Sequence, residues 1–243
     1  MEIVTVASRP DLNDQLWDLT SVWPEFMLND PTGDLYYSYT DRWAEFIILA
    51  VDDGYVAARG FSVPFAFGEP VGRPELPDGG WDEVVRWSAR DFADEVPTTH
   101  VSALEIGIDP RYRGSGLAGD MVVAMHENAR RQGFDVMYAP VRPSRKHLEP
   151  KVSMEAYAYR TRADGLPEDP WLRVHARLGA TIEKVCPMAM VIAGTLNDWQ
   201  TWTGLPFDES GEVIVPGALA PVRVSVEQGT AVYVEPNVWM RHG

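Results

Sequence analysis

The sequence predicts an α/β fold built on a mixed sheet, and three local patterns support that prediction. Asp52-Asp53-Gly54 separates two β-rich runs, and Asp-Gly supplies the positive φ angles of a tight hairpin turn, so antiparallel strands are expected there. Residues 101–141 read as strand, helix and strand, which predicts a parallel pair joined by a crossover helix. Residues 81–92 have apolar residues at helical spacing before that unit.

The N-terminal segment predicts a strand followed by a helix. Residues 2–6 alternate weakly and indicate a short strand. Residues 10–26 are expected to be one helix, because apolar side chains recur at helical spacing at Leu12, Leu16, Leu19 and Trp23. Residues 29–41 are rich in turn formers and predict a loop or a short second helix that presents tyrosines.

The remaining elements follow from the same periodicities. Gly133 is a natural stop for the helix of residues 116–132, and Asp169-Pro170 is a start signal for the next helix. The irregular stretch 143–170 is long for a compact domain and is expected to be functional or mobile. The expected strands are 45–51, 55–66, 101–108, 136–141, 181–194, 212–215, 222–226 and 231–234, and the later helices are 170–178 and 196–203. Residues 233–239 are expected to close the sheet or to form a dimer seam.

Length and composition predict one globular domain. The chain has 243 residues, of which 45% are hydrophobic and 23% charged. We expect residues 1–195 to form the core with an insertion at 143–170, and residues 196–243 to extend the same domain. A single cysteine suits a cytoplasmic protein, and no apolar run approaches the ~18 residues of a membrane helix. No metal site is expected, because neither a Cys-x-x-Cys pair nor a His-Glu-x-x-His motif occurs.

The charge distribution excludes one class of partner and favours another. The net charge is −15, which argues against nucleic acid as a partner. Residues 111–151 nevertheless carry eight basic and four acidic groups, so an anionic ligand is expected to bind in the middle of the chain. A solvated face is the alternative interpretation of such a charge cluster.

A glycine-rich turn at residues 114–119 has the most informative pattern. Gly-Ser-Gly-Leu-Ala-Gly matches a dinucleotide fingerprint literally, but five residues separate the strand from its first glycine and no acidic residue ends the next strand. A Walker loop is excluded because Leu117 and Ala118 replace the required Lys and Ser or Thr. The turn exposes backbone N–H groups at a helix N-terminus beside Arg111 and Arg113, which predicts an anion site.

The stretch Ile108-Asp109-Pro110-Arg111-Tyr112-Arg113-Gly114-Ser115-Gly116-Leu117-Ala118 resembles the acyl-coenzyme A signature of the GNAT N-acetyltransferase superfamily. Arg113, Gly116 and Ala118 meet the core pattern Arg/Gln-x-x-Gly-x-Gly/Ala. The resemblance covers residues 45–142 well and extends plausibly over 1–195. It implies a mixed, mostly antiparallel twisted sheet with splayed central strands and helices on both faces.

The resemblance also implies how acetyl-CoA or another acyl-CoA is held as acyl donor. Pyrophosphate would bind the N–H groups of residues 113–118, which adds Gly114, Ser115 and Leu117 to the binding residues already named. Backbone groups near Ile106, Gly107 and Ile108 would hold pantetheine and polarise the thioester carbonyl. Fixed donors of this kind stabilise a developing oxyanion by commonly ~3 kcal/mol each.

Two residues are candidates for proton transfer. An ammonium group cannot attack a thioester, and Glu105 stands on the strand where the superfamily often places its general base; the alternative is a structural ion pair with Arg59 or another strand neighbour. His175 in His-Ala-Arg-Leu-Gly-Ala replaces the thiolate-protonating Tyr of the family's pattern, and an imidazole would donate a proton near neutral pH. Tyr157 and Tyr159 are alternative donors.

The acceptor residues are assigned by position alone. Family members gather acceptor contacts between the first two helices, which implies Glu25, Phe26, Tyr36 and Tyr37, and Tyr157 of the insertion is added to them. The bulk of residues 143–170 favours a small-molecule acceptor.

The expected activity is therefore transfer of an acetyl group from acetyl-CoA to the amine of a small molecule by direct attack, in a monomer or homodimer. The alternatives are O- or S-acyl transfer, decarboxylation of an acyl-CoA, and a non-catalytic acyl-CoA-binding regulatory protein.

Overall fold

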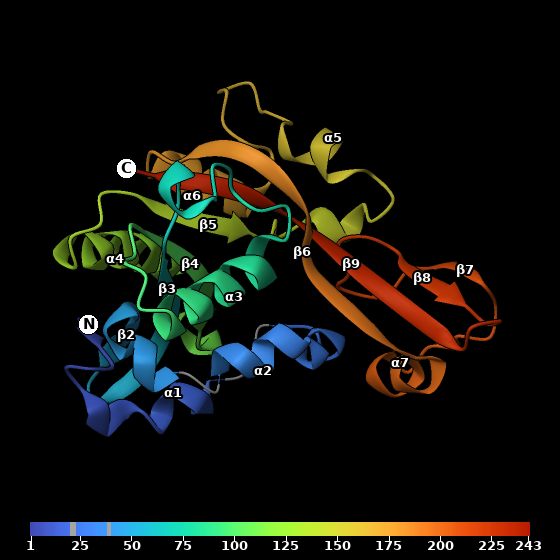
Figure 1. Ribbon diagram of the computed structural model, residues 1–243, viewed down its shortest axis with the longest axis horizontal. Coiled ribbons are helices and arrows are strands. Elements are labelled where there is room, and N and C mark those ends of the chain that lie inside the picture. The colour runs from blue at the N-terminus through green and yellow to red at the C-terminus, as the bar shows by residue number, and fades with distance from the viewer. Residues whose placement is uncertain (20–22, 38–39) are drawn as a thin grey trace.

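Strands from both ends of the chain build one mixed sheet (Figure 1). The computed structural model describes residues 1–19, 23–37 and 40–243, and only the backbone of Tyr37, Thr40 and Asp41. Within these residues the strands are β1 (Glu2–Thr5), β2 (Ile47–Asp52), β3 (Tyr55–Phe65), β4 (His100–Ile108), β5 (Met137–Val141), β6 (Thr181–Thr195), β7 (Gly211–Val213), β8 (Val222–Ser225) and β9 (Thr230–His242). The helices are α1 (Gln15–Asp18), α2 (Pro31–Tyr37), α3 (Gly80–Ala93), α4 (Leu117–Arg131), α5 (Met154–Ala158), α6 (Pro170–Arg177) and α7 (Leu196–Thr203).

The strand order is β1-β2-β3-β4-β5-β9-β8-β7, and β6 pairs with β9. Every described pairing is antiparallel except β4 with β5, which is parallel as the strand-helix-strand pattern predicted. The β2–β3 hairpin turns at Asp53 and Gly54, whose φ angles are 50° and 82°. The α/β class with a mostly antiparallel sheet is thus confirmed.

Helices cover both faces of the sheet. On one face α4 inserts Leu117, Met121 and Met125 against Ile48 and Ala58 of β2 and β3. Gly60 of β3 allows this close approach, since a Cβ there would lie 2.9 Å from the Met125 sulfur. The other face carries α1, α2, α3 and α7 over a core rich in aromatic side chains. Amphipathic strand and helix faces therefore close two layers around the sheet.

The predicted helix over residues 10–26 is wrong. In its place are short 3-10 turns at Pro10–Leu12 and Glu25–Asn29 and the four-residue helix α1. Two causes are local: the Leu16 carbonyl accepts a hydrogen bond from the Arg59 guanidinium (2.7 Å), and Pro24 disfavours helical backbone at the residue before it. The apolar spacing still serves burial, because Leu12, Leu16 and Leu19 all lie in the core.

The last strand is longer and more central than the sequence predicted. Val238 and Trp239 of β9 lie between β5 and β6, whereas residues 233–235 pair with β6 alone among the described strands. The segment therefore closes the sheet by joining β5 to β6, and the dimer seam stays a prediction. Pro236 is tolerated inside it because the pairing with β6 skips from Cys186–Asn237 to Met190–Glu235 at that point. β6 and β9 extend as a long curved pair that ends beside α7, β7 and β8 (Figure 1). Residues 45 and 46, predicted as strand, belong instead to a 3-10 turn that precedes β2.

Candidate active site

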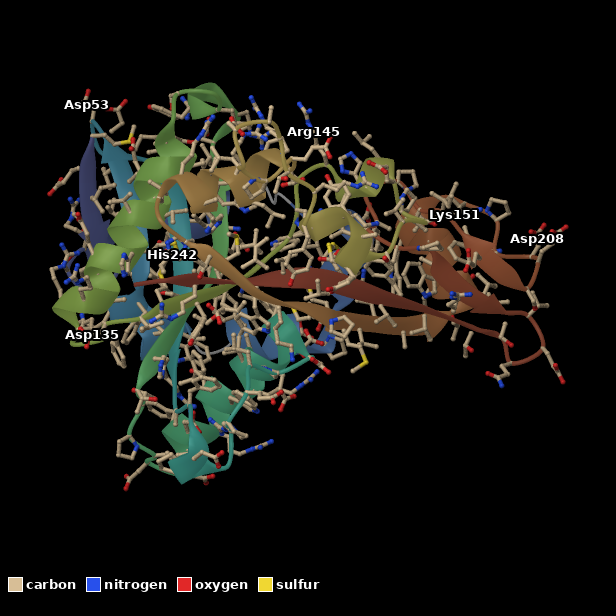
Figure 2. All side chains as sticks on the ribbon, turned by 90° about the horizontal axis from the view of Figure 1, so that it is seen from above. Asp53, Asp135, Arg145, Lys151, Asp208 and His242 are labelled. Carbon is tan, nitrogen blue, oxygen red and sulfur yellow. The ribbon has the colours of Figure 1, made fainter. Side chains whose placement is uncertain are left out.

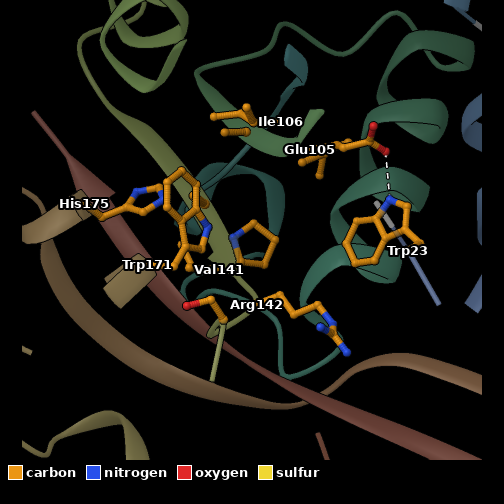
Figure 3. A pocket seen from close by; sticks show the side chains of 12 residues that line it. Trp23, Glu105, Ile106, Val141, Arg142, Trp171 and His175 are labelled. Atoms are coloured by element: carbon orange, nitrogen blue, oxygen red, sulfur yellow. Dashed lines mark hydrogen bonds between the residues drawn. The ribbon is translucent and has the colours of Figure 1, made fainter. Parts of the chain in front are cut away.

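The parallel strands β4 and β5 separate soon after they begin. They pair only at Val101–Met137 and Ser102–Tyr138, and β5 then continues beside β9. A register shift opposite Phe61 and Ser62 of β3 marks a bulge in this part of β4, and bulges bend the strand that carries them. A cavity of about 330 Å³ lies between the separated strands, and its walls come from β4, β5, α6 and Trp23 (Figure 3).

The open edge of β4 supplies backbone groups to this gap. Ile106, Gly107 and Ile108 are paired with β3 on one side only, and Ile106 lines the cavity. An unpaired strand edge presents N–H and C=O groups to any extended chain that lies beside it. Residues 106–108 therefore offer an open strand edge, and their role in holding pantetheine stays a prediction.

The glycine-rich turn is the candidate anion site, and it lies at the N-terminus of the long helix α4. Gly116 is the residue before the helix and has φ 93°. The backbone N–H groups of Gly114, Gly116 and Ala118 have no hydrogen-bond partner among the described residues, and Arg113 is exposed there. The Ser115 hydroxyl donates to the Tyr112 carbonyl (2.7 Å) and faces the Leu117 N–H, which holds the turn in shape. Unpaired amides, the helix dipole and one cation together favour a bound phosphate.

Arg111 has a different environment from Arg113. Its guanidinium donates to both Asp109 oxygens (3.0 and 3.2 Å) and lies over the Tyr55 ring, 4.2 Å from the centroid. The hydrogen bonds from Arg111 hold the pKa of the Asp109 carboxyl well below its usual range. Arg111 therefore braces the loop before the candidate anion site, and its predicted contact with the ligand stays a prediction.

Glu105 lies on the wall of the cavity and is 6% exposed (Figure 3). Its Oε1 accepts hydrogen bonds from the Arg59 Nε (2.9 Å) and lies 2.8 Å from the second guanidinium nitrogen. Its Oε2 accepts from the indole N–H of Trp23 (2.9 Å). Gly107 leaves room for this pair, because a Cβ there would lie 3.2 Å from the Arg59 Nε. The ion pair that the sequence suggested as an alternative role is thus present, and it orients the carboxylate at the cavity.

His175 also lines the cavity, and its partner is a second histidine. Its Nδ1 lies 2.9 Å from the Nε2 of His242, so the two rings share one proton, while its Nε2 has no partner among the described residues. The Trp171 ring meets the imidazole edge to face at 4.7 Å. Burial, with a smaller contribution from His242, lowers the pKa of His175 to about 3. The ring is therefore neutral at physiological pH, and the hydrogen that it can offer is that of a neutral imidazole.

The residues assigned to the acceptor by position are not brought to this cavity. Phe26 packs on Trp199 and Tyr233, and Tyr36 is buried among Trp43, Phe61 and Trp81. Glu25 is exposed on the surface, and the Tyr37 side chain lies outside the described residues. Trp23, Trp171 and Ser144 line the cavity instead, and no motif in the sequence marks them as site residues.

Tyr157 has a structural position in the insertion. Its hydroxyl donates to the Asp169 carboxylate (2.9 Å), which caps the N-terminus of α6. Burial and this carboxylate raise the pKa of Tyr157 far above its usual value. Tyr159, the other alternative donor, is about half exposed and does not line the cavity.

The basic segment contributes less free charge than its composition suggested. Arg142 is bound to the buried Glu235 at 3.0 Å, and the fully buried Lys146 donates to the carbonyls of Glu149 and Leu219. Burial lowers the pKa of Lys146. Over the described parts of the chain, no helix is long and apolar enough to cross a membrane.

The whole chain is similar to proteins of known activity. No family model matches the sequence. The arginine N-acetyltransferase avaD of Aspergillus versicolor is 31% identical over 98% of this chain and 92% of its own length.

Two solved structures share the fold. The loading GNATL domain of CurA from Lyngbya majuscula superposes with a TM-score of 0.62 at 15% identity, covering 99% of this chain and 96% of that one. The GNAT-like decarboxylase GphF, solved with isobutyryl-CoA, has a TM-score of 0.60 at 16% identity over 100% and 99% of the two chains. These two structures agree in fold with the arginine N-acetyltransferase relative, which matches this chain over nearly its full length, and with the splayed strands and the glycine-rich turn. The chain therefore belongs to the GNAT superfamily of N-acetyltransferases and is an acyltransferase.

Proposed function

We propose that the protein transfers an acetyl group from acetyl-CoA to the amine of a small molecule, by direct attack within a ternary complex. The observation that carries the proposal is the cavity between β4 and β5, which has the Glu105 carboxylate on one wall and His175 on another. The candidate anion site follows β4 in the chain, at the start of α4. The 31% identical relative is named an arginine N-acetyltransferase, which supports an amine acceptor.

The donor is assigned to the anion site and the open edge of β4. The pyrophosphate of the coenzyme binds the N–H groups of residues 113–118 beside Arg113, and pantetheine lies along residues 106–108. The thioester then reaches the cavity, where the backbone of β4 supplies donors for the carbonyl oxygen. Such donors act on the charge that develops during attack and need no reorganisation.

Glu105 is assigned the proton of the attacking amine. The nitrogen forms a bond to the thioester carbonyl carbon, its proton passes to the carboxylate, directly or through water, and the carbon–sulfur bond breaks. Arg59 and Trp23 hold both carboxylate oxygens, so the group is fixed in position before the acceptor arrives.

His175 is assigned a hydrogen bond to the leaving thiolate, which takes its proton from the protonated Glu105 or from water, because a neutral imidazole donates a hydrogen bond without giving up its N–H proton. In the tautomer where His242 donates to its Nδ1, the Nε2 of His175, a residue that lines the cavity, carries a proton. His242 is thereby a positioning residue, because its hydrogen bond selects which nitrogen of His175 holds the proton.

The test begins with calorimetric titration of acetyl-CoA into the wild-type protein and the Arg113→Glu variant, followed by thiol release with a panel of amines. Tight binding that is lost in the variant, together with thiol release that depends on an amine, supports the proposal. Thiol release only with alcohols or thiols, carbon dioxide release from malonyl-CoA, or binding without turnover would each replace it with one of the three alternatives.

A further inference from the structure

A second, smaller cavity shares a wall with the first. It has a volume of about 40 Å³ and lies between the turn at Glu25–Asn29, α2 and α3, with Asp30, Asp34, Trp23 and Trp81 in its walls. Trp23 lines both cavities, and its indole N–H is bound to Glu105. Trp23 thus contributes to the walls of both cavities and contacts the proposed base.

Asp30, which lines this second cavity, is one of two buried carboxyl groups that lie together, the other being Asp82. Asp30 and Asp82 are each 2% exposed, and their carboxyl groups face each other. The Oδ1 of Asp30 accepts the Thr32 N–H (2.7 Å), and the Oδ2 of Asp82 accepts the Val191 N–H (3.3 Å). The other oxygen of each, Oδ2 of Asp30 and Oδ1 of Asp82, has no hydrogen-bond donor among the described residues.

The charge of this pair is incompletely balanced. Arg86 is the cation that faces it, at 3.4 Å from Asp82, but its side chain is 45% exposed and it also lies 3.6 Å from Glu83. Burial raises the pKa of both carboxyl groups, that of Asp82 to about 8 with a further contribution from Asp30, so the pair holds a proton at neutral pH. A cationic group entering the cavity would replace that proton and pair with the freed carboxylate.

The walls of the cavity specify the kind of cation. Trp23 and Trp81 present indole rings, and the Trp81 N–H is itself without a partner among the described residues. A guanidinium is planar, weakly hydrated, stacks on aromatic faces and donates two parallel hydrogen bonds to a carboxylate, whereas an ammonium is a strongly hydrated point charge. Aromatic walls with a carboxylate therefore favour a guanidinium.

We infer that this cavity is an acceptor subsite, in which Asp30 with Asp82 binds a guanidinium at one end of the substrate while the amine at its other end lies beside Glu105. The inference rests on the proposed function and narrows its acceptor class to amines that carry a guanidinium.

Arginine and citrulline test it, because citrulline has the same shape and amine but an uncharged urea group. We expect wild-type kcat/KM to favour arginine over citrulline by at least about 30-fold, the scale of a charge pair removed from a desolvated site. In Asp30→Asn the preference should fall below about threefold, mainly through the KM of arginine. Asparagine keeps the side-chain oxygen that caps α2, so the fold is expected to persist.

Asp208→Asn is the matched control, since Asp208 is exposed on the turn before β7 (Figure 2) and does not line the cavity, so it should leave the arginine preference unchanged. Equal use of arginine and citrulline by the wild type, or an equal loss for both in Asp30→Asn, would overturn the subsite while amine acetylation still stood. Absence of thiol release with every amine would instead reject the proposed function.

Discussion

The anion site makes a prediction that separates backbone strain from ligand binding, because α4 has a similar glycine at each end. Gly116 before the helix has φ 93° and Gly133 after it has φ 91°, and a Cβ built on either meets nothing within 4 Å. An alanine at either position therefore adds no clash, and its cost is the left-handed backbone alone, about 1–2 kcal/mol. For a chain of this length that corresponds to a fall in Tm of about 2–8 °C for either variant.

The two variants should differ in binding. Gly116→Ala relieves its strain by rotating the peptide groups on either side of it, and these carry the N–H groups of the anion site. Each charge-assisted hydrogen bond to phosphate is worth about 1.5–3 kcal/mol, so loss of one should weaken acetyl-CoA binding about 10- to 100-fold. Gly133→Ala has the same strain at the other end of the helix and should bind normally.

Calorimetric titration of both variants, beside thermal unfolding, measures the two effects separately. The reasoning is refuted if both variants bind acetyl-CoA alike, because the N–H groups of the turn would then contribute nothing beyond the stability of the fold. Unequal losses of Tm would show instead that the surroundings of the two glycines differ.

Three further predictions concern proton transfer and pH. Glu105→Gln should lower kcat/KM about 10²- to 10⁴-fold in a thiol-release assay without weakening acetyl-CoA binding, since the amide oxygen still accepts from Arg59; unchanged turnover would reduce Glu105 to a structural residue. His242→Phe should lower kcat about 10- to 100-fold at an unchanged KM for acetyl-CoA, and nitrogen NMR should show that His175 no longer holds a single tautomer. A rise in the KM for acetyl-CoA at an unchanged kcat would contradict the positioning role. In the folded state the pKa of Asp82 is about 8, whereas in the unfolded chain an aspartate loses its proton near pH 4. The free energy of unfolding should therefore fall as the pH rises from 4 to 8. Urea unfolding of Asp82→Asn should show a flatter pH dependence over that window, and an equally steep one would show that the carboxyl pair is not its source.

Local sequence was enough to predict features that depend on neighbouring residues. The hairpin at Asp53-Gly54, the parallel pair around α4 and the cap of α6 by Asp169 all follow from backbone sterics and hydrogen bonds within a few residues. The anion turn belongs to the same class, because its glycines and the helix that follows are contiguous. A tertiary contact outweighed the helical periodicity of residues 10–26. The Arg59 guanidinium donates a hydrogen bond to the Leu16 carbonyl, and the helix described there is only the four-residue α1.

The site itself depended on the tertiary structure. Glu105 meets Trp23 across 82 residues and His175 meets His242 across 67, and no spacing in the sequence signals either contact. The sequence did name Glu105 and His175, but their proton affinities depend on burial and on partners that come from other strands. It could not place Asp30 opposite Asp82, since the packing of α3 beside α2 brings them together. Backbone conformation is a local property of the chain, whereas desolvation and charge pairing arise only when distant segments pack, and these determine what the side chains of this protein do.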